Sequence, residues 1–471
     1  MGHMIDKIQK MDKISVGLEL LSDDLRKCYE ENFQEQWRLI AYNRLTELKN
    51  YSEELQLEIT GVLVQIQGLI VETLNEELYT TVDYFLQKTR EIFSKLYLYN
   101  IHSEETYKEE CIENYYGTEY EKNALLVYIL RPFIFKDMVP DHTNQVEARI
   151  IAEVLSQKGY NVDLVNSKYV GKLDAEKYNL VIGTGKPFEE LCNNHGQDTI
   201  AIYYLTGSSS YFANMAELKR MRYFEERNHY MPRFERLSLD LLDLSVLVKA
   251  DAAICLGNEH TVSTYDGTFS HIYPLNVTGF SDCTLPAINK KVNNINFLWY
   301  GGAGPIHKGL DLCMEAFREL PQLNLYIVGD VTNEFYELYR EDFENSENIL
   351  YYGFLRKDSA EFQQVCESCD FCICPSCSEG QSTAVVSTMF SGIIPVCTKE
   401  TGIDVVQAGG FEIVSIEISE LVQLIRGLSE LPLEEVEARQ RQVYEYASTN
   451  HSVENYKKSF SEILDNILGV V

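Results

Sequence analysis

The chain has 471 residues, 45% of them hydrophobic, and a formal net charge of -31, so it is long enough for two or three domains with separate cores. The negative charge argues against nonspecific nucleic-acid binding, because a phosphate backbone would be repelled. No apolar run reaches the roughly 20 residues of a membrane helix, and no signal peptide is visible, which predicts a cytoplasmic protein and leaves peripheral attachment to an inner membrane open.

Residues 1–122 are predicted to form long helices. No proline occurs before Pro132, and apolar residues recur at helical spacing. Two stripes are formed by Leu18, Leu21, Leu25 and Cys28, and by Leu55, Ile59, Val62 and Ile66. We expect a bundle or a coiled hairpin that acts as a scaffold, forms a homo-oligomer or binds a partner. A polar, tyrosine-rich linker is expected at residues 102–122.

Residues 123–285 are predicted to form a doubly wound α/β domain. The expected helix covers residues 145–155, and the expected strands cover residues 124–130, 161–165, 179–183, 199–205 and 252–256. Near-continuous apolar strands that alternate with helices are typical of a parallel sheet covered on both faces.

The same pattern restarts in residues 286–445, which are predicted to form a second domain. Its expected helix covers residues 310–317, and its expected strands cover residues 297–302, 325–328, 349–353, 371–374 and 394–396. Residues 446–471 are assigned to a C-terminal helix. The predicted fold class is therefore α/β, with two Rossmann-like domains, a cleft between them and an additional all-helical N-terminal region.

Three polar or glycine-rich loops follow strands of the second domain, at residues 301–309, 376–383 and 398–404. Ligands of open α/β sheets bind beyond the carboxyl ends of the strands, so we expect these loops to meet at one cleft. Lys308 could reach a diphosphate, and the helix that follows residue 382 could hold a phosphate. Glu379 has no cation partner nearby in sequence, which leaves a role in binding sugar hydroxyls open. The alternative is plain strand–helix turns, with Ser382 or Thr383 capping the helix.

Five cysteines lie close together in the same region. They are Cys366, Cys369, Cys372, Cys374 and Cys377. Their spacing partly matches an iron–sulfur motif, but the proline falls too early in it. A helix followed by an apolar strand would disperse the thiols, so we interpret them as buried core residues and expect no metal site.

Residues 297–405 resemble the donor-binding half of GT-B glycosyltransferases, in the large retaining family 4 that uses nucleotide sugars. The resemblance rests on Gly302-x5-Lys308-Gly309, on the motif PSCSEG at residues 375–380, and on Met389 and Gly392. The segments HKGLD, PSCSEGQS and KETGID are similar to a subgroup associated with bacterial surface polysaccharides. Residues 123–285 match the acceptor-side domain in layout, whereas the helical region lies outside the resemblance.

The resemblance implies transfer of a sugar from a nucleotide-diphosphate sugar to a glycan, a lipid-linked glycan or a protein, with retention and without a metal or other cofactor. Lys308 would contact the diphosphate and Glu379 the transferred sugar, as the two catalytic residues. The implied donor-binding residues are Gly301, Gly302, Gly304, Lys308, Ser378, Glu379, Gly380, Gln381, Ser382, Thr383, Ser387 and Thr401. Backbone N–H groups of residues 380–382 would face sugar or phosphate. On the acceptor side, the candidates are His142, Thr143, Asn144, Thr206 and Gly207, for which a local turn and helix cap is the alternative role.

Two positions depart from the family pattern. Ser387 stands where a glutamate commonly binds the ribose, and Ala303 stands where an arginine usually follows the glycine. These departures keep open a non-catalytic GT-B-like accessory or scaffold protein of a glycosylation complex. A sugar-nucleotide epimerase or a phosphorylase on the same fold is a third class.

Overall fold

The computed structural model of the chain divides into two compact units, Met1–Glu110 with Lys168–Gly171, and Cys111–Ser167 with Lys172–Val471. It describes residues 2–30, 35–54, 109–135, 140, 142–194, 196, 198–237, 249–280, 295–357 and 359–470, and in addition residues 60, 63, 64, 66, 67, 79, 82, 83, 86, 87 and 89. No helix in these described ranges has both the length and the apolar character needed to cross a bilayer.

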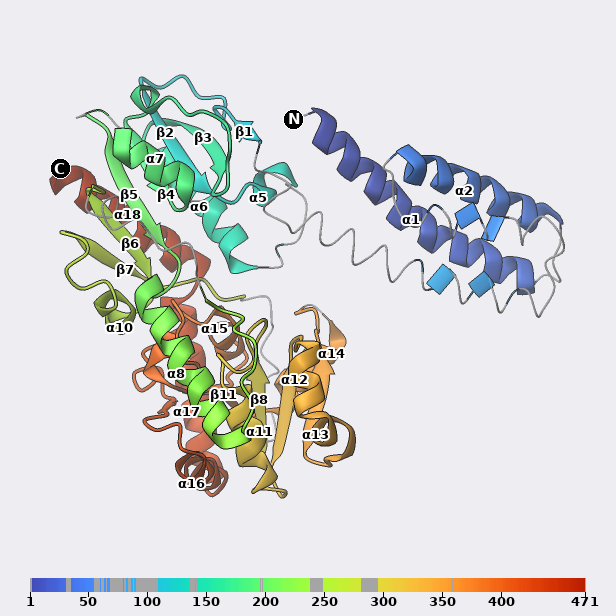
Figure 1. Cartoon of the computed structure of the whole chain (residues 1–471). Coiled ribbons are helices and arrows are strands. Elements are labelled where there is room, and N and C mark those ends of the chain that lie inside the picture. The colour runs from blue at the N-terminus through green and yellow to red at the C-terminus, as the bar shows by residue number, and fades with distance from the viewer. Residues whose placement is uncertain are drawn as a thin grey trace. The chain divides into compact units, whose positions relative to one another are not determined.

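The first unit contains two long helices, α1 (Gly2–Glu30) and α2 (Glu35–Glu54), drawn in blue in Figure 1. Among the described residues, the core of this unit includes Met11, Ile14, Leu18, Leu21 and Leu25 of α1, Ala41, Leu45 and Leu48 of α2, and Leu63, Ile66, Val82 and Leu86 from the chain beyond α2. The helices approach closely, since a Cβ atom at Gly17 would lie 2.5 Å from Leu48 Cδ2. The first predicted stripe is thus confirmed at Leu18, Leu21 and Leu25. The side chain of Cys28, residues 55, 59 and 62, and residues 102–108 of the expected linker lie outside the described residues. The rest of that linker is described and contains a short strand, Cys111–Ile112.

The second unit begins with a seven-stranded sheet in the order β1-β3-β2-β4-β5-β6-β7. The strands are β1 (Cys111–Ile112), β2 (Lys122–Tyr128), β3 (Tyr160–Asn166), β4 (Leu180–Gly183), β5 (Ile200–Leu205), β6 (Ala252–Leu256) and β7 (Ile272–Leu275). All neighbours are parallel except β1 and β3. The five predicted strands are confirmed. Sequence reasoning missed β1 and β7, which lie at the edges of the sheet and lack a continuous buried apolar run.

The helices of this part include one that positions the site. They are α5 (Arg131–Ile134), α6 (Thr143–Gln157), α7 (Lys186–Asn194), α8 (Ser210–Asn228) and α10 (Glu259–Ser263). The amphipathic helix predicted at residues 145–155 is confirmed as α6. Helix α8 was not predicted, because its buried positions include the charged residues Glu217 and Arg220 beside Met221 and Phe224, so its apolar periodicity is weak.

The second sheet has six parallel strands in the order β10-β9-β8-β11-β12-β13. They are β8 (Asn296–Tyr300), β9 (Asn324–Val328), β10 (Ile349–Gly353), β11 (Phe371–Cys374), β12 (Ile394–Cys397) and β13 (Phe411–Glu412). The chain runs from β8 through β9 to β10, then returns to the other side of β8 with β11. The order therefore reverses between β8 and β11, the place where open α/β sheets bind ligands.

Helices flank this sheet and lead the chain back to the first one. They are α11 (Leu310–Arg318), α12 (Asn333–Leu338), α13 (Arg340–Asn345), α14 (Ala360–Ser368), α15 (Thr383–Met389), α16 (Ile418–Ser429), α17 (Leu433–Asn450) and α18 (Val453–Val470). Helix α18, in dark red in Figure 1, packs against α6 and β7. The Tyr456 hydroxyl meets the buried Tyr204 hydroxyl of β5 at 2.7 Å. The break between the last two helices falls after Asn450, whereas residue 446, the predicted start of the C-terminal helix, lies inside α17.

Candidate functional site

The loop between β8 and α11 lies against the loop after β11. Its glycines make this possible: Gly304 and Gly309 have φ values of 84° and 74°, which side chains rarely adopt. A Cβ atom at Gly309 would lie 2.5 Å from Pro375 Cγ. Gly302 has open space where a side chain would stand. The first loop is thus shaped by close packing at one end and is open at the other.

Hydrogen bonds join the three loops that the sequence singled out. Cys377 N donates to His307 O at 3.0 Å, Glu379 N donates to Glu400 O at 2.9 Å, and Ser382 N donates to Thr401 O at 2.9 Å. The predicted convergence of the loops is confirmed. Because its N–H already binds Thr401, Ser382 is not the available phosphate donor that the resemblance implies. Ser382 is the N-cap of α15, but its side chain makes no capping hydrogen bond.

Lys308 and Glu379, the two implied catalytic residues, form an ion pair between Nζ and Oε1. Their side chains are only 14% and 10% exposed, and Ser376 Oγ donates to the same carboxylate oxygen at 3.1 Å. Burial alone would raise the pKa of Glu379, but the positive charges of Lys308 and then Arg236 outweigh it, so the pKa lies below its ordinary value. Glu379 therefore does have a cation partner, 71 residues away in sequence, and stays ionised at neutral pH.

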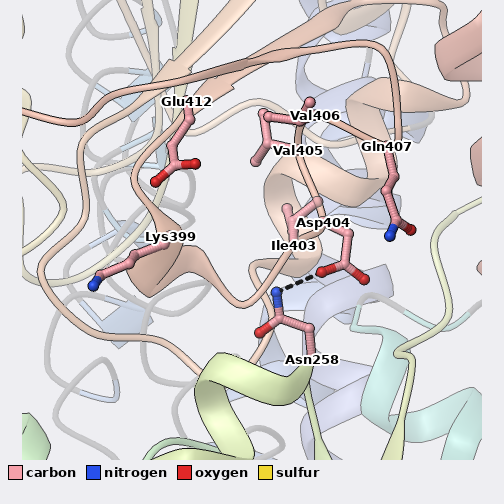
Figure 2. Close-up of a pocket in the computed structure, with 8 residues that line it drawn as sticks. All are labelled: Asn258, Lys399, Ile403, Asp404, Val405, Val406, Gln407 and Glu412. Atoms are coloured by element: carbon pink, nitrogen blue, oxygen red, sulfur yellow. Dashed lines mark hydrogen bonds between the residues drawn. The ribbon is translucent and has the colours of Figure 1, made fainter.

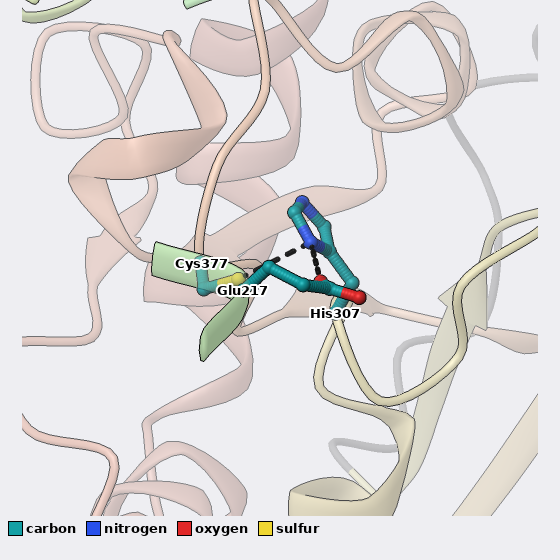
Figure 3. Close-up of side chains that lie close together, drawn as sticks. All are labelled: Glu217, His307 and Cys377. Carbon is teal, nitrogen blue, oxygen red and sulfur yellow. Dashed lines mark hydrogen bonds and ion pairs between the residues drawn. The ribbon is translucent and has the colours of Figure 1, made fainter. Parts of the chain in front are cut away.

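A fully buried pair is formed by His307, the neighbour of Lys308 in sequence, and Glu217 of α8 (Figure 3). Nδ1 of His307 contacts the Glu217 carboxylate, and Nε2 lies 2.7 Å from Ser378 O. Burial would lower the pKa of His307, but hydrogen bonds with Cys377 and Glu217 raise it to about 9. Glu217, His307 and Cys377 together offer potential metal-ligand atoms within 4.8 Å of one another, the one such group among the residues that the structure describes.

Helix α8 connects the two sheets through two more charged residues, of which Arg220 is buried. Arg220 donates to Ile306 O at 3.1 Å and to Pro375 O at 2.8 Å, and thus binds the first two loops at once. Arg227 forms ion pairs with Asp311 and Glu315 of α11. Sequence reasoning missed Glu217, Arg220 and Arg227; their spacing of three and seven residues on one helix face was the available pattern.

The implied acceptor-side residues divide into two groups. His142 caps α6 by accepting a hydrogen bond from Asn144 N at 3.2 Å, which is the alternative structural role. Thr143 Oγ1 and Asn144 Oδ1 are buried and have no hydrogen-bond partner among the described residues. Thr206 and Gly207, by contrast, touch the donor loop: a Cβ atom at Gly380 would lie 2.7 Å from Thr206 O and 2.9 Å from Gly207 Cα.

Several implied donor-binding groups are already engaged by the protein itself. Gln381 accepts from Val277 N at 2.8 Å and donates to Gly402 O at 2.9 Å. Ser387 Oγ donates to Thr383 O at 2.6 Å, one helical turn earlier. Thr401 Oγ1 donates to Thr398 O at 2.8 Å. The Ser378 hydroxyl contacts that of Ser208, and Thr261 Oγ1 donates to Gly380 O at 2.7 Å. These groups hold the loops in place.

Four of the five clustered cysteines are buried core residues. Cys366, Cys369, Cys372 and Cys374 are buried, and burial raises the pKa of Cys374 to about 11. The interpretation as core residues is confirmed for these four. Cys377 differs, since it is half-buried and its Sγ lies 3.4 Å from His307 Nδ1.

A separate pocket of about 190 Å³ lies between Asn258 and the segment that follows β12 (Figure 2). Asn258 Nδ2 donates to Asp404 Oδ1 at 2.9 Å across it. Its lining residues are Asn258, Lys399, Ile403, Asp404, Val405, Val406, Gln407 and Glu412. None of them belongs to the implied donor-binding set.

Two Rossmann-like sheets with the ligand site at the strand-order reversal define the GT-B fold. Sucrose-phosphate synthase from Thermosynechococcus elongatus shares it, with a TM-score of 0.52 and 10% identity over 74% of this chain and 99% of that one. Anabaena HepE in complex with UDP and glucose matches with a TM-score of 0.47 and 15% identity, over 74% of this chain and 100% of its own. WaaG, a glycosyltransferase involved in lipopolysaccharide biosynthesis, matches with a TM-score of 0.46 and 15% identity over 72% and 98%.

Residues 294–430 match the family described as glycosyl transferases group 1. This segment contains both Lys308 and Glu379. The chain therefore carries a group 1 glycosyltransferase domain and is a sugar transferase. A search of curated protein sequences found no match.

Proposed function

We propose that the chain transfers a sugar from a nucleotide-diphosphate sugar to a glycan, a lipid-linked glycan or a protein, with retention of configuration, in polysaccharide biosynthesis. The observation that supports this most is the part-buried Lys308–Glu379 pair at the strand-order reversal of the group 1 domain. A cation suits a diphosphate, and an ionised carboxylate accepts hydrogen bonds from sugar hydroxyls.

Lys308 would act on the charge that develops as the bond between the sugar and the diphosphate breaks. An ammonium group has three donors, so Lys308 can keep its contact with Glu379 and still bind a phosphate oxygen. Electrostatic stabilisation of this kind is usually the largest single contribution to catalysis. The departing phosphate can itself take the acceptor's proton, so the proposal requires no dedicated general base.

The test is transfer or donor hydrolysis with UDP, GDP and dTDP sugars. Lys308→Ala and Glu379→Ala should each lower kcat by about 100-fold or more, as the loss of one preorganised charge contact does elsewhere. Lys399→Ala is the matched control, because Lys399 lies in the neighbouring loop but lines the separate pocket. Unchanged activity in both site variants would refute the assignment. If wild-type protein binds none of these nucleotides, the scaffold alternative is favoured.

We also propose that transfer needs no metal ion. In the one group of potential ligands among the described residues, both ring nitrogens of His307 are already engaged, Nδ1 by the Glu217 carboxylate and Nε2 by Ser378 O. A metal ion there would have to displace one of these contacts. Activity should therefore survive chelation with EDTA, and loss of activity that added metal restores would contradict this.

Finally, we propose that the helical unit mediates self-association. The exposed large hydrophobic side chains among the described residues of α1 and α2 include Leu20 at 42%, Leu39 at 58% and Ile40 at 39%. Light scattering should give a mass above the 54.2 kDa of one chain, and Leu39→Glu should reduce it. A mass of one chain at every concentration would contradict self-association and leave a different partner for this unit.

A further inference from the structure

A diphosphate needs more positive charge than Lys308 alone supplies. At neutral pH the two phosphates of a nucleotide sugar carry about two negative charges, and each is stabilised best by a cation within hydrogen-bond reach. Lys308 is already paired with Glu379, so the net charge of that pair is zero. Residues 301–309 contain no other lysine and no arginine.

Arg236, which follows α8 in the first domain, lies beside this loop. A Cβ atom at Gly304 would lie 2.7 Å from Arg236 Cγ and 3.0 Å from Arg236 Cδ, so the aliphatic part of the Arg236 side chain packs against Gly304. The side chain is exposed, and its guanidinium has no hydrogen bond or ion pair with any of the residues that the structure describes. It is therefore an available cation beside the glycine loop.

The backbone of Arg236 is held in this place by carboxylates. Glu217 Oε1 accepts from Arg236 N at 3.2 Å and from Glu235 N at 3.3 Å. The Glu235 carboxylate in turn accepts from Gly304 N at 2.9 Å and from the Thr332 hydroxyl at 3.0 Å. Because Glu217 is itself fixed by His307, one network ties Arg236 to the loop that ends in Lys308.

The other cations near the loops are committed elsewhere. Arg220 binds two backbone carbonyl groups, and Arg227 binds two carboxylates of α11. Arg236 differs from both, although its charge is near enough to Glu379 to contribute, after Lys308, to lowering the pKa of that carboxyl group. The positive charge of Arg236 thus already stabilises the ionised Glu379 carboxylate.

We propose that Arg236 is the second cation for the donor, so that its guanidinium binds one phosphate group while Lys308 binds the other. This inference rests on the proposed function. It means that the diphosphate bridges the two Rossmann-like domains, and that the loop after α8 supplies a positive charge in addition to Lys308. A planar guanidinium is suited to this, since it can give two parallel hydrogen bonds to a phosphate.

The experiment is calorimetric titration of the full chain with UDP, GDP and dTDP, and with UMP, GMP and dTMP. Arg236→Ala should weaken binding of the diphosphate by about 10- to 100-fold and affect the monophosphate less. Arg236→Lys should recover part of the loss. Arg233→Ala is the matched control, because Arg233 is exposed on the same loop, and it should bind like wild type.

The outcomes distinguish failure of the proposed role of Arg236 from failure of the proposed function. If wild-type protein binds a diphosphate and Arg236→Ala binds it equally well, the role of Arg236 is refuted and the proposed function stands. An equal loss for diphosphate and monophosphate would also refute it, because that pattern indicates a general disturbance of the loop. If wild type binds none of the six nucleotides, the proposed function fails and the inference fails with it.

Discussion

The buried His307–Glu217 pair should make the second unit less stable as the pH rises from about 6.5 to about 9. His307 is 2% exposed and Glu217 is fully buried. Although burial acts against the charged imidazole, hydrogen bonds with Cys377 and Glu217 hold the pKa of His307 at about 9. Histidine in an unfolded chain titrates near 6.5. The folded state therefore binds this proton more tightly, so its stabilising effect is complete below about pH 6.5 and is lost as the pH rises through about 9.

The size of the effect follows from the shift. A pKa that moves from 6.5 to about 9, at about 1.4 kcal/mol per unit, corresponds to on the order of 3 kcal/mol. His307→Gln keeps a polar side chain of similar size and cannot be charged. Between pH 6 and pH 10, wild type should lose on the order of 3 kcal/mol more free energy of unfolding than this variant does.

Urea unfolding followed by tryptophan fluorescence can measure this locally. The chain has two tryptophans, and Trp37→Phe leaves Trp299, whose Nε1 donates to Lys308 O at 3.3 Å. The reporter therefore lies next to the residue being tested. Comparing the variant with wild type removes the contribution of other groups that titrate in this range. Parallel pH profiles for the two proteins would refute the reasoning.

Two further predictions concern stability. Burial raises the pKa of Glu147 to about 7, although hydrogen bonds from Thr278 oppose this, so the folded state is destabilised as the pH rises from about 4.5 to about 7. From pH 5 to pH 8, wild type should lose on the order of 3 kcal/mol of unfolding free energy relative to Glu147→Gln. A difference between the two proteins that stays constant with pH would contradict this. Gly402 has a φ of 70°, and a Cβ atom there would lie 1.8 Å from a carbonyl oxygen, so Gly402→Ala should cost about 1–3 kcal/mol. Gly427→Ala, in α16 with open space around it, should be neutral or stabilising by about 0.5–1 kcal/mol; equal melting temperatures for these two variants would contradict the steric reasoning.

The central strands could be predicted because burial on both faces makes them continuous apolar runs. The strand Phe371–Cys374, for example, is buried at every position. The edge strands β1 and β13 have two residues each, too few for any periodic pattern. Helix α8 was not predicted for a different reason. Its charged residues Glu217 and Arg220 are buried, and buried charged residues interrupt the apolar pattern that identifies a helix.

The sequence could predict only those site residues whose chemical role is visible within a single loop. Glycines, Lys308 and Glu379 stand at strand ends that any doubly wound sheet brings together. The partner of Glu379 lies 71 residues away and that of His307 lies 90 residues away on α8, so neither pairing is visible in local sequence. The same holds for Arg236, which belongs to the other sheet's half of the second unit.

Hydrogen exchange of the full chain, with and without a nucleoside diphosphate that stabilises it, tests the central claim most directly. Ligand that binds at Lys308 and Glu379 should protect backbone amides in peptides that cover residues 301–309 and 376–383, and this protection should disappear in Lys308→Ala. The pocket of Figure 2 is the internal comparison, because its lining residues 403–407 follow in the next loop. Protection confined to residues 403–412, with none in the first two loops, would contradict the account.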